Sequence, residues 1–470
     1  MLIDRGLFSA SVLSLAIGCS GADTGETSPT SGSASVSSRE LAEVQQGLAS
    51  YRPVGAKLMI IGNMTDELVG NVTDDAIYVD RIAADVGGPQ QMRILVVPGA
   101  SASPIWFYTY LQALATSRGV PLSNIDIAHI ASSDDSDTSD VDESTWANGA
   151  YQASELVKLQ AANVVWFDGG DQDRLVPLLI DAAGHDSPFQ AAMRARLQAN
   201  NLIVAGYSAG AAIMSNPMIG NGTSWAALTE PLDTTPNCTG DVQLCVTRGL
   251  GYIPSAYNVI VDQHFTERGR FPRLLRALAA GNVATGWGVS EYTAFYVDLQ
   301  ARTAEVVGLP ERGNVTIIGR DGAKANHEHI GPPFLGEDYT VSVLAVGDTY
   351  TLPDTAHAHG VGIDPVKSDY YQPFSAYYSD MPIFTDAFGN KVLIDNITTY
   401  FADGTPQASG ARVDAMGFVV NESGSASGFR FRFTADNKSK VAWNFDSGYS
   451  MFNARLKITT LSAQFTGVGP

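Results

Sequence analysis

Short runs of apolar residues recur between residues 57 and 261, each bounded by glycine or polar residues and separated by helix-length segments. A strand that is apolar along its whole length must be covered on both faces, as in parallel strands that alternate with helices. The runs are Lys57–Ile61, Arg93–Val97, Ile125–Ala131, Asn163–Phe167, Asn201–Ala205 and Val259–Val261. The sequence therefore predicts an α/β fold in which helices cover both faces of a parallel sheet.

The run at Asn201–Ala205 leads into Gly206-Tyr207-Ser208-Ala209-Gly210, a G-x-S-x-G pattern followed by small residues. A serine on a tight strand-to-helix turn exposes its hydroxyl above the sheet, and the start of a helix favours negative charge. In a chain with 46 glycines, the same pattern can also be an ordinary turn. We take Ser208 as the candidate nucleophile.

A second loop, Asp168-Gly169-Gly170, directly follows the run at Asn163–Phe167. Consecutive glycines let backbone N–H groups approach a reacting carbonyl oxygen, which is what an oxyanion hole requires. The amides of Gly169, Gly170 and Ala209 are the candidate donors. The alternative is a strand-to-helix loop that is merely capped by an aspartate.

Serine needs a neighbouring base, and histidine is the usual provider. Of the seven histidines, His264 follows the predicted strand at Val259–Val261. Glu291 follows another apolar run and could hold the imidazole in the required tautomer. The chain order Ser, His, Glu differs from the Ser, acid, His order of α/β-hydrolases.

Three arginines follow His264 and form a local positive cluster in an acidic chain: Arg268, Arg270 and Arg273. Guanidinium groups bind carboxylates well, so the cluster suits recognition of an acidic substrate. The alternative is that these arginines are solvated or paired with surface acids.

Four segments together resemble the cyanophycinases and, more distantly, peptidase E. They are Gly206–Ala211 (GYSAGA), Gly169–Leu175 (GGDQDRL), Asp262–Arg273 (DQHFTERGRFPR) and Gly286–Ala294 (GWGVSEYTA), and the resemblance covers residues 52–350. It implies a flavodoxin-like, class I glutamine amidotransferase-like fold, a homodimer, no cofactor, and a Ser208–His264–Glu291 triad. The family's cleft positions correspond to Gln172, Asp262, Gln263, Arg268, Arg270 and Arg273. Tyr207 and Ser290 depart from the family's threonine and aspartate, and a bulky Tyr207 would reshape the cleft.

The formal net charge of −20 argues against binding to nucleic acid or to anionic membrane surfaces. Two histidine pairs, His327/His329 and His357/His359, have a spacing seen in metal sites, but two exposed polar strands explain them better. The acidic segment 134–143 lacks the glycine of an EF-hand loop. We therefore predict no metal site.

The N-terminus has the pattern of an export signal: an apolar run follows Arg5, and small residues precede Cys19. We expect residues 1–19 to be a lipoprotein-type signal peptide, with Cys19 lipidated and a lipid anchor as the sole membrane attachment. The alternative is an ordinary signal peptide with an incidental cysteine. Residues 20–50, rich in Ser, Thr and Gly, are expected to be a linker. The protein would then be periplasmic, at the cell surface, or secreted.

Cys238 and Cys245 remain once Cys19 is assigned to the signal. In an oxidising compartment they are expected to form a disulfide, because no partner for a zinc knuckle lies nearby. Beyond residue 290, short alternating strands replace the helical pattern. We predict a peptidase-like domain at 51–352 and a β-rich accessory domain at 353–470.

The resemblance implies a serine peptidase that hydrolyses cyanophycin, a polymer with an aspartate backbone and arginine branches, to β-Asp-Arg dipeptides, and the N-terminal pattern predicts that it is exported. Two alternatives stay open. One is a peptidase for other aspartyl or isoaspartyl peptides. The other is a surface-anchored binding lipoprotein without catalysis, although a domain freed from catalysis need not keep all three residue types of the triad.

Overall fold

The structure is a computed structural model, and residues 36–470 form one compact unit in it. It describes residues 54–64, 72–235, 238, 240, 242–309, 312–320, 328–353, 360–362, 368–369, 383–384, 412–420, 425–436, 438–444 and 448–464. The predicted signal peptide, Cys19 and the predicted linker lie outside the described residues. The predicted domain boundaries stay a prediction.

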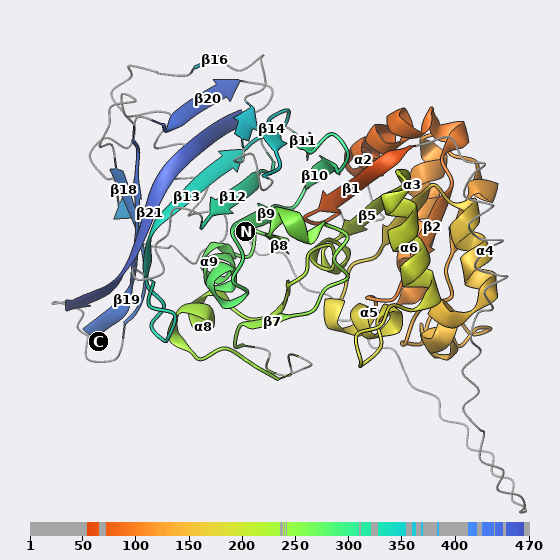
Figure 1. The fold of residues 1–470 in the computed structure, drawn as a ribbon, viewed down its shortest axis with the longest axis horizontal. Helices are drawn as coiled ribbons and strands as arrows, with labels where there is room; N and C mark the ends of the chain where they lie inside the picture. The colour runs from red at the N-terminus through yellow and green to blue at the C-terminus, as the bar shows by residue number, and fades with distance from the viewer. Residues whose placement is uncertain are drawn as a thin grey trace, which may run out of the picture. The chain divides into compact units, whose positions relative to one another are not determined.

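A nine-stranded sheet forms the first half of the fold, in the order β15-β14-β11-β10-β1-β5-β4-β2-β3 (Figure 1). Five of its strands pair in parallel, which confirms the predicted α/β class. They are β1 (Gly55–Ile61), β2 (Ile94–Val97), β3 (Ile125–Ile127), β4 (Val164–Phe167) and β5 (Asn201–Tyr207). Strand β3 is shorter than the predicted run at Ile125–Ala131.

Helices cover both faces of the parallel strands, as the uninterrupted apolar runs require. Along β1, Leu58 and Ile60 pack with the helices of one face, whereas Met59 and Ile61 pack with those of the other. The first face carries α4 (Ala153–Ala161), α5 (Gln172–Leu179) and α6 (Pro188–Gln198), and the second carries α2 (Val72–Val86) and α3 (Pro104–Ser117) (Figure 1).

Antiparallel strands extend this sheet beyond β1. They are β10 (Thr293–Asp298), β11 (Thr303–Gly308), β14 (Thr349–Thr351) and β15 (Gly360–Gly362). Because β10 occupies the free side of β1, no edge remains there for the strand that precedes His264.

That strand, β8 (Val259–Asp262), lies instead at the end of a second sheet, so its predicted place in the first sheet is wrong. It pairs in parallel with β9 (Thr285–Val289). The sheet continues through β12 (Val315–Gly319), β13 (Gly336–Leu344), β21 (Gly448–Gln464), β19 (Ser425–Thr434), β18 (Arg412–Val420) and β17 (Ile383–Phe384), with β20 (Lys440–Asn444) and β16 (Ser368–Asp369) branching from β21. The described C-terminal residues are thus β-rich, as predicted, and β21 joins them to β13.

Two helices, α8 (Ser224–Thr229) and α9 (Phe271–Ala280), pack against the second sheet. Phe271 contacts the rings of Phe431 and Phe433 from β19. The other elements are α7 (Ala209–Ala212), a two-stranded ribbon of β6 (Met218–Asn221) and β7 (Cys245–Thr247), and short 3-10 helices at Pro89–Gln91, Leu122–Asn124, Glu143–Tyr151 and Ser255–Tyr257. Within the described ranges, no helix is long and apolar enough to cross a membrane.

Candidate active site

Ser208 lies on the turn between β5 and α7, in a backbone conformation with φ of 52° and ψ of −112°. A residue with a side chain rarely adopts a positive φ, so the surrounding structure must hold it there. The flanking glycines allow the turn, because a Cβ at Gly206 would lie 2.4 Å from the carbonyl oxygen of Gly210. Helix α7 is a single short turn.

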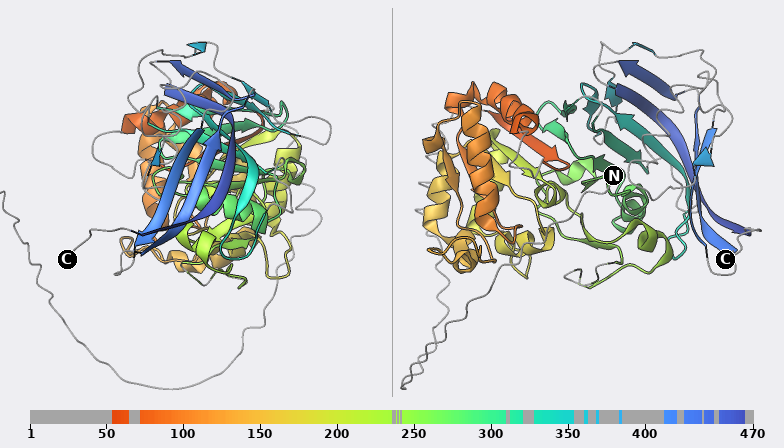
Figure 2. Two further views of the ribbon diagram at one scale, coloured as in Figure 1. Left: turned by 90° about the vertical axis from the view of Figure 1, so that its left-hand side faces the viewer. Right: turned by 180° about the vertical axis from the view of Figure 1, so that it is seen from behind.

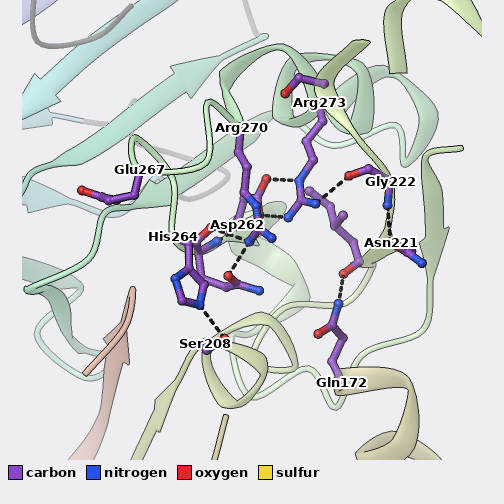
Figure 3. A network of polar contacts seen from close by, with 12 residues as sticks. Gln172, Ser208, Asn221, Gly222, Asp262, His264, Glu267, Arg270 and Arg273 are labelled. Atoms are coloured by element: carbon purple, nitrogen blue, oxygen red, sulfur yellow. Dashed lines mark hydrogen bonds and ion pairs between the residues drawn. The ribbon is translucent and has the colours of Figure 1, made fainter. Parts of the chain in front are cut away.

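The structure brings together the three residues of the predicted triad. Nε2 of His264 lies 2.8 Å from Oγ of Ser208 (Figure 3). Nδ1 of the same ring lies 2.5 Å from Oε1 of Glu291. The serine, base and acid therefore form one hydrogen-bonded chain, the arrangement that activates a serine hydroxyl for attack.

His264 is 3% exposed, and burial lowers its pKa below the ordinary value of 6.5. The carboxylate of Glu291 opposes this shift, whereas the charges of Arg268 and Arg270 add to it. The imidazole is therefore mainly neutral at neutral pH. In that state Nδ1 can donate to Glu291 while Nε2 accepts from Ser208, as a general base requires.

Three successive carbonyl groups at the end of β1 hold the backbones of all three triad loops. The oxygen of Ile61 accepts from the amide of Ser208 at 3.1 Å, and that of Gly62 accepts from the amide of His264 at 3.3 Å. The oxygen of Asn63 accepts from the amide of Tyr292, next to Glu291, at 3.4 Å. Gly62 has no room for a side chain, because a Cβ there would lie 1.9 Å from the carbonyl oxygen of Ser290.

Glu267 is a site residue to which we assigned no role from the sequence. Its Oε2 accepts from the backbone amide of Glu291 at 2.9 Å, and its Oε1 accepts from the hydroxyl of Thr266. Glu267 thereby fixes the loop that carries the acid. Its place three residues after His264 was the only available signal, and acidic residues at such a spacing are common on ordinary exposed helices and loops.

The predicted oxyanion loop lies beside the elbow. The amide of Gly210 donates to the carbonyl oxygen of Asp168 at 3.0 Å, which joins the two turns. The Asp168 carboxyl accepts from the amides of Ala100 and Ser101 at 3.0 and 2.9 Å. Burial raises the pKa of this carboxyl to about 8, and the two amides act in the opposite direction.

Both glycines of this loop are sterically required. Gly170 has φ of 136°, and a Cβ there would lie 2.3 Å from the oxygen of Ala100. A Cβ at Gly169 would lie 2.4 Å from the ring of Tyr207. Tyr207 also packs against Phe107 with 4.7 Å between ring centroids. Tyr207, one of the two departures from the family pattern, is therefore buried against the predicted oxyanion loop.

Among the predicted cleft residues, Asp262 and Arg273 form a buried ion pair that supports the site. Nε and Nη2 of Arg273 donate to the two carboxylate oxygens of Asp262 at 2.8 and 2.5 Å. Nη1 donates to the carbonyl oxygen of Gly222 at 2.8 Å. Both side chains are buried, and their hydrogen-bonding groups are paired with each other (Figure 3). They therefore position neighbouring groups of the site.

The other predicted cleft residues differ in exposure. Gln172 follows Asp171, which caps α5, and its Nε2 donates to the carbonyl oxygens of Ile219 and Gly220. Nη1 of Arg270 donates to the backbone and side-chain oxygens of Gln263, and burial lowers the pKa of Arg270 to about 9. Arg268 is exposed beside His264 and makes no ion pair with any described residue. It is thus the arginine most available to a substrate.

Cys238 and Cys245 form a disulfide, with 5.5 Å between their Cα atoms, as predicted. Cys245 begins β7, which pairs with β6. Sγ of Cys238 lies against Gly220, where an added Cβ would approach it to 2.4 Å. The disulfide therefore packs against Gly220, whose carbonyl oxygen accepts from Gln172.

His329 is the one member of the two histidine pairs that the structure describes. Nδ1 of His329 lies 2.8 Å from the carbonyl oxygen of Pro333. His327, His357 and His359 lie outside the described residues. No group of three or more His, Cys, Asp or Glu side chains among the described residues could hold a metal ion.

A parallel α/β sheet presents a serine on a strained turn, and this serine is hydrogen-bonded to a histidine that contacts a glutamate, the arrangement on which serine hydrolases rely. No family model matches the chain. Sequence relatives do match it. A cyanophycinase from Trichormus variabilis is 34% identical over 197 residues, 41% of this chain and 58% of the relative. One from Synechococcus elongatus is 32% identical over 221 residues, 46% of this chain and 62% of the relative.

A cyanophycinase from Geminocystis herdmanii is 28% identical over 299 residues, 63% of this chain and 93% of the relative. The crystal structure of a peptidase from an acI-B1 actinobacterium has a TM-score of 0.36 to this chain at 18% identity, covering 56% of this chain and 90% of that one. The chain spans less than two thirds of the length of the first relatives that it matches. Over these stretches the chain is similar to cyanophycinases.

Proposed function

We propose that the protein is a serine peptidase that hydrolyses cyanophycin. The single observation that carries the proposal is the hydrogen-bonded chain from Ser208 through His264 to Glu291. The sequence similarity to three cyanophycinases supports the substrate class. In keeping with the resemblance, the proposed products are β-Asp-Arg dipeptides.

In the proposed mechanism, Oγ of Ser208 attacks the backbone carbonyl carbon of the polymer while Nε2 of His264 takes the hydroxyl proton. Glu291 stabilises the resulting imidazolium. His264 then gives the proton to the leaving amine, and the peptide C–N bond breaks. Water, deprotonated by His264, cleaves the acyl-enzyme and frees the serine.

Backbone amides would stabilise the oxyanion of the tetrahedral intermediate. The amide of Ser208 is used by the carbonyl group of Ile61, so the first amide after the nucleophile is that of Ala209. The glycine pair at 169 and 170 supplies the facing loop. Exposed Arg268 is suited to a carboxylate of the substrate, whereas Arg270 and Arg273 are held by protein oxygens.

The proposal includes export, lipid attachment at Cys19 and a homodimer. The signal-like pattern of residues 1–19 and the disulfide between Cys238 and Cys245 support export, because disulfides persist in oxidising compartments. The dimer rests on the family resemblance. Mass analysis of the N-terminus would test the lipid attachment, and light scattering would test the dimer.

The activity is tested by clearing of a cyanophycin suspension, with the soluble products identified by mass. We expect the intact protein to release β-Asp-Arg dipeptides and Ser208→Ala to release none. Ser132→Ala, at an exposed serine outside the site, should match the intact protein. Equal clearing by Ser208→Ala would overturn the mechanism. If the intact protein cleaved isoaspartyl peptides but not the polymer, the mechanism would stand and the substrate would be the alternative class, other aspartyl or isoaspartyl peptides.

A further inference from the structure

The C-terminal strands carry a charge bias opposite to that of the whole chain. Residues 412–464 contain seven Lys or Arg and four Asp or Glu, whereas the chain has a formal net charge of −20. A reversed bias within one segment concentrates positive charge on one part of an acidic protein. Such a local field attracts carboxylates that the rest of the surface repels.

The strands β18, β19 and β21 have two distinct faces. Phe429, Phe431 and Phe433 of β19 are buried against the second core cluster, where Phe429 and Phe431 contact the rings of Trp225 and Phe271. Because side chains alternate along a strand, the intervening residues of β19 lie on the opposite face. This opposite face carries the charges.

The pairing register places the charged residues in adjacent rows. Arg432 lies opposite Asp414 on one side and Lys457 on the other. Thr434, the next residue on the same face, lies between Arg412 and Arg455. Arg430 begins a third row. We call this surface the outer cationic face, which comprises Arg412, Arg430, Arg432, Arg455 and Lys457 with the carboxylates of Asp414, Asp436 and Glu337.

Each carboxylate of the outer cationic face is engaged by a cation. Asp414 accepts two hydrogen bonds from Arg432, at 2.8 and 2.9 Å, and lies 3.8 Å from Arg430. Arg455 lies 3.2 Å from Asp436, and Lys457 pairs with Glu337. Five cations thus face three carboxylates. The side chains of Arg455 and Lys457 remain 38% and 52% exposed, and Arg412 is exposed.

No described element covers the outer cationic face. In the left panel of Figure 2 these strands face the viewer, and the helices of the fold lie behind them. Among the described residues, the exposed large hydrophobic side chains lie elsewhere, at Leu122, Val141, Tyr151, Val157, Val242 and Ile330. The face is therefore charged without an apolar wedge, which is unlike a surface that inserts into a membrane.

We infer that the outer cationic face binds the polymeric substrate, a polypeptide that carries regularly repeated carboxylate and guanidinium groups. The inference rests on the proposed function. Side chains on one face repeat about every 6.7 Å along a strand and about every 4.8 Å across strands, so they offer a lattice of both signs to a repeating polymer. Many weak contacts of this kind retain a polymer near an enzyme and raise its effective concentration.

The test separates binding from hydrolysis. Full-length Ser208→Ala is mixed with insoluble cyanophycin, and the bound fraction is measured by sedimentation at several salt concentrations. We expect the added triple change Arg412→Gln, Arg455→Gln and Lys457→Gln to weaken binding about tenfold, since each exposed ion pair changes an equilibrium by only about two- to fivefold. The dependence of binding on salt should also become shallower.

The control carries Arg93→Gln, Arg118→Gln and Arg248→Gln, three exposed cations outside the outer cationic face. This control should bind as the parent does. Both triple changes are also made in the protein with intact Ser208 and assayed on a soluble β-Asp-Arg oligomer, which needs no docking surface. We expect both triple variants to turn over the soluble oligomer equally. The variant changed on the outer cationic face should nevertheless bind the insoluble polymer more weakly and clear it more slowly.

If both triple variants bound the insoluble polymer equally and still hydrolysed the soluble oligomer, the docking surface would be overturned and the proposed function would stay in place. Polymer binding that depends on the outer cationic face, without hydrolysis of either substrate by the intact protein, would support the surface and overturn the function. Vesicles of phosphatidylcholine and phosphatidylglycerol form the last arm. If the triple variant changed on the outer cationic face lost binding to these vesicles but kept binding to the polymer, the partner of this face would be an anionic membrane and not the polymer.

Discussion

The two halves of the candidate site are built in different ways. Ser208 and the Gly169–Gly170 loop belong to neighbouring parallel strands of the first sheet, and each follows its strand directly. His264 and Glu291 follow β8 and β9 at the end of the second sheet. The nucleophile is thus placed by local turns, whereas the base and the acid reach it only because two sheets meet correctly.

Two joints connect these halves. The first is the end of β1, where the carbonyl groups of three successive residues hold the three triad loops. The second is the β6–β7 ribbon with the residue that follows β6: the carbonyl group of Gly220 accepts from Gln172 on one side, and that of Gly222 accepts from Arg273 on the other. A site divided between two sheets therefore depends on backbone groups that lie outside the triad.

The largest effect is expected from removal of the serine or its base, and it shows whether the two halves of the site act as one unit. Ser208→Ala and His264→Ala should each lower kcat/KM by about 10⁴- to 10⁶-fold. Because the serine and its base serve the same step, the double variant should be no slower than the slower single variant. Steady-state kinetics on a soluble β-Asp-Arg oligomer would measure this. Losses that multiply in the double variant would show that the halves act independently.

The next effect concerns the second half alone. Glu291→Gln should lower kcat by about 10²- to 10⁴-fold, because the imidazolium loses its counter-charge. Glu291 raises the pKa of His264 against the effect of burial, so removing its charge should lower that pKa further. Activity rises with pH as His264 loses its proton, and the acid limb of the profile should therefore move to lower pH.

The matched control for this change is Glu230→Gln, at an exposed glutamate outside the site. It should leave both kcat and the pH profile unchanged. An acid limb that moved to higher pH in Glu291→Gln would contradict the assigned direction of the electrostatic effect.

A smaller effect is expected at the first joint. Gly62→Ala places a Cβ where only 1.9 Å separates it from the oxygen of Ser290, so the two sheets must move apart. We expect a loss of about 2–4 kcal/mol in the free energy of unfolding, at the upper end of overpacking costs. Chemical denaturation would measure it. Gly331→Ala is the control, since its Cβ would come no closer than 3.4 Å to a neighbour.

The smallest effect is expected at the second joint. The pair of changes Cys238→Ser and Cys245→Ser should lower the free energy of unfolding by about 2 kcal/mol, as expected for a short closed loop. KM should rise more than kcat falls, because the ribbon supports Gln172 and Arg273 and not the triad. A reducing agent should reproduce the effect in the parent protein and add nothing in the double variant. An unchanged KM in both would show that the ribbon does not support the cleft.

The sequence predicted the first half of the site more completely than the second. The elbow and the glycine loop follow apolar strands directly, and such local patterns are visible in a single sequence. The residues His264 and Glu291 were also found, but the sheet that carries them was not. Whether β8 pairs with β1 or with β9 depends on which strand occupies the free side of β1, and side-chain patterns do not reveal long-range pairing.

The supporting groups were the hardest to predict. The carbonyl groups of Ile61, Gly62 and Asn63 act through the backbone, so no side chain at these positions reveals that they hold the triad loops. Arg273 belongs to a recognisable cluster, yet only the structure shows that it is buried on Asp262 while Arg268 is exposed. Among the charged residues of a segment, burial separates those that support a site from those that can meet a substrate.

The three carbonyl groups at the end of β1 also determine what kinds of mutation this site can accept in evolution. Replacing Asn63 by another residue leaves its carbonyl group in place, so exchange of side chains there is compatible with an intact triad. Insertion or deletion of one residue would instead displace the acceptors by about 3.3 Å along the strand and mismatch all three loops at once. This stretch should therefore keep a constant length among related proteins even where its composition drifts.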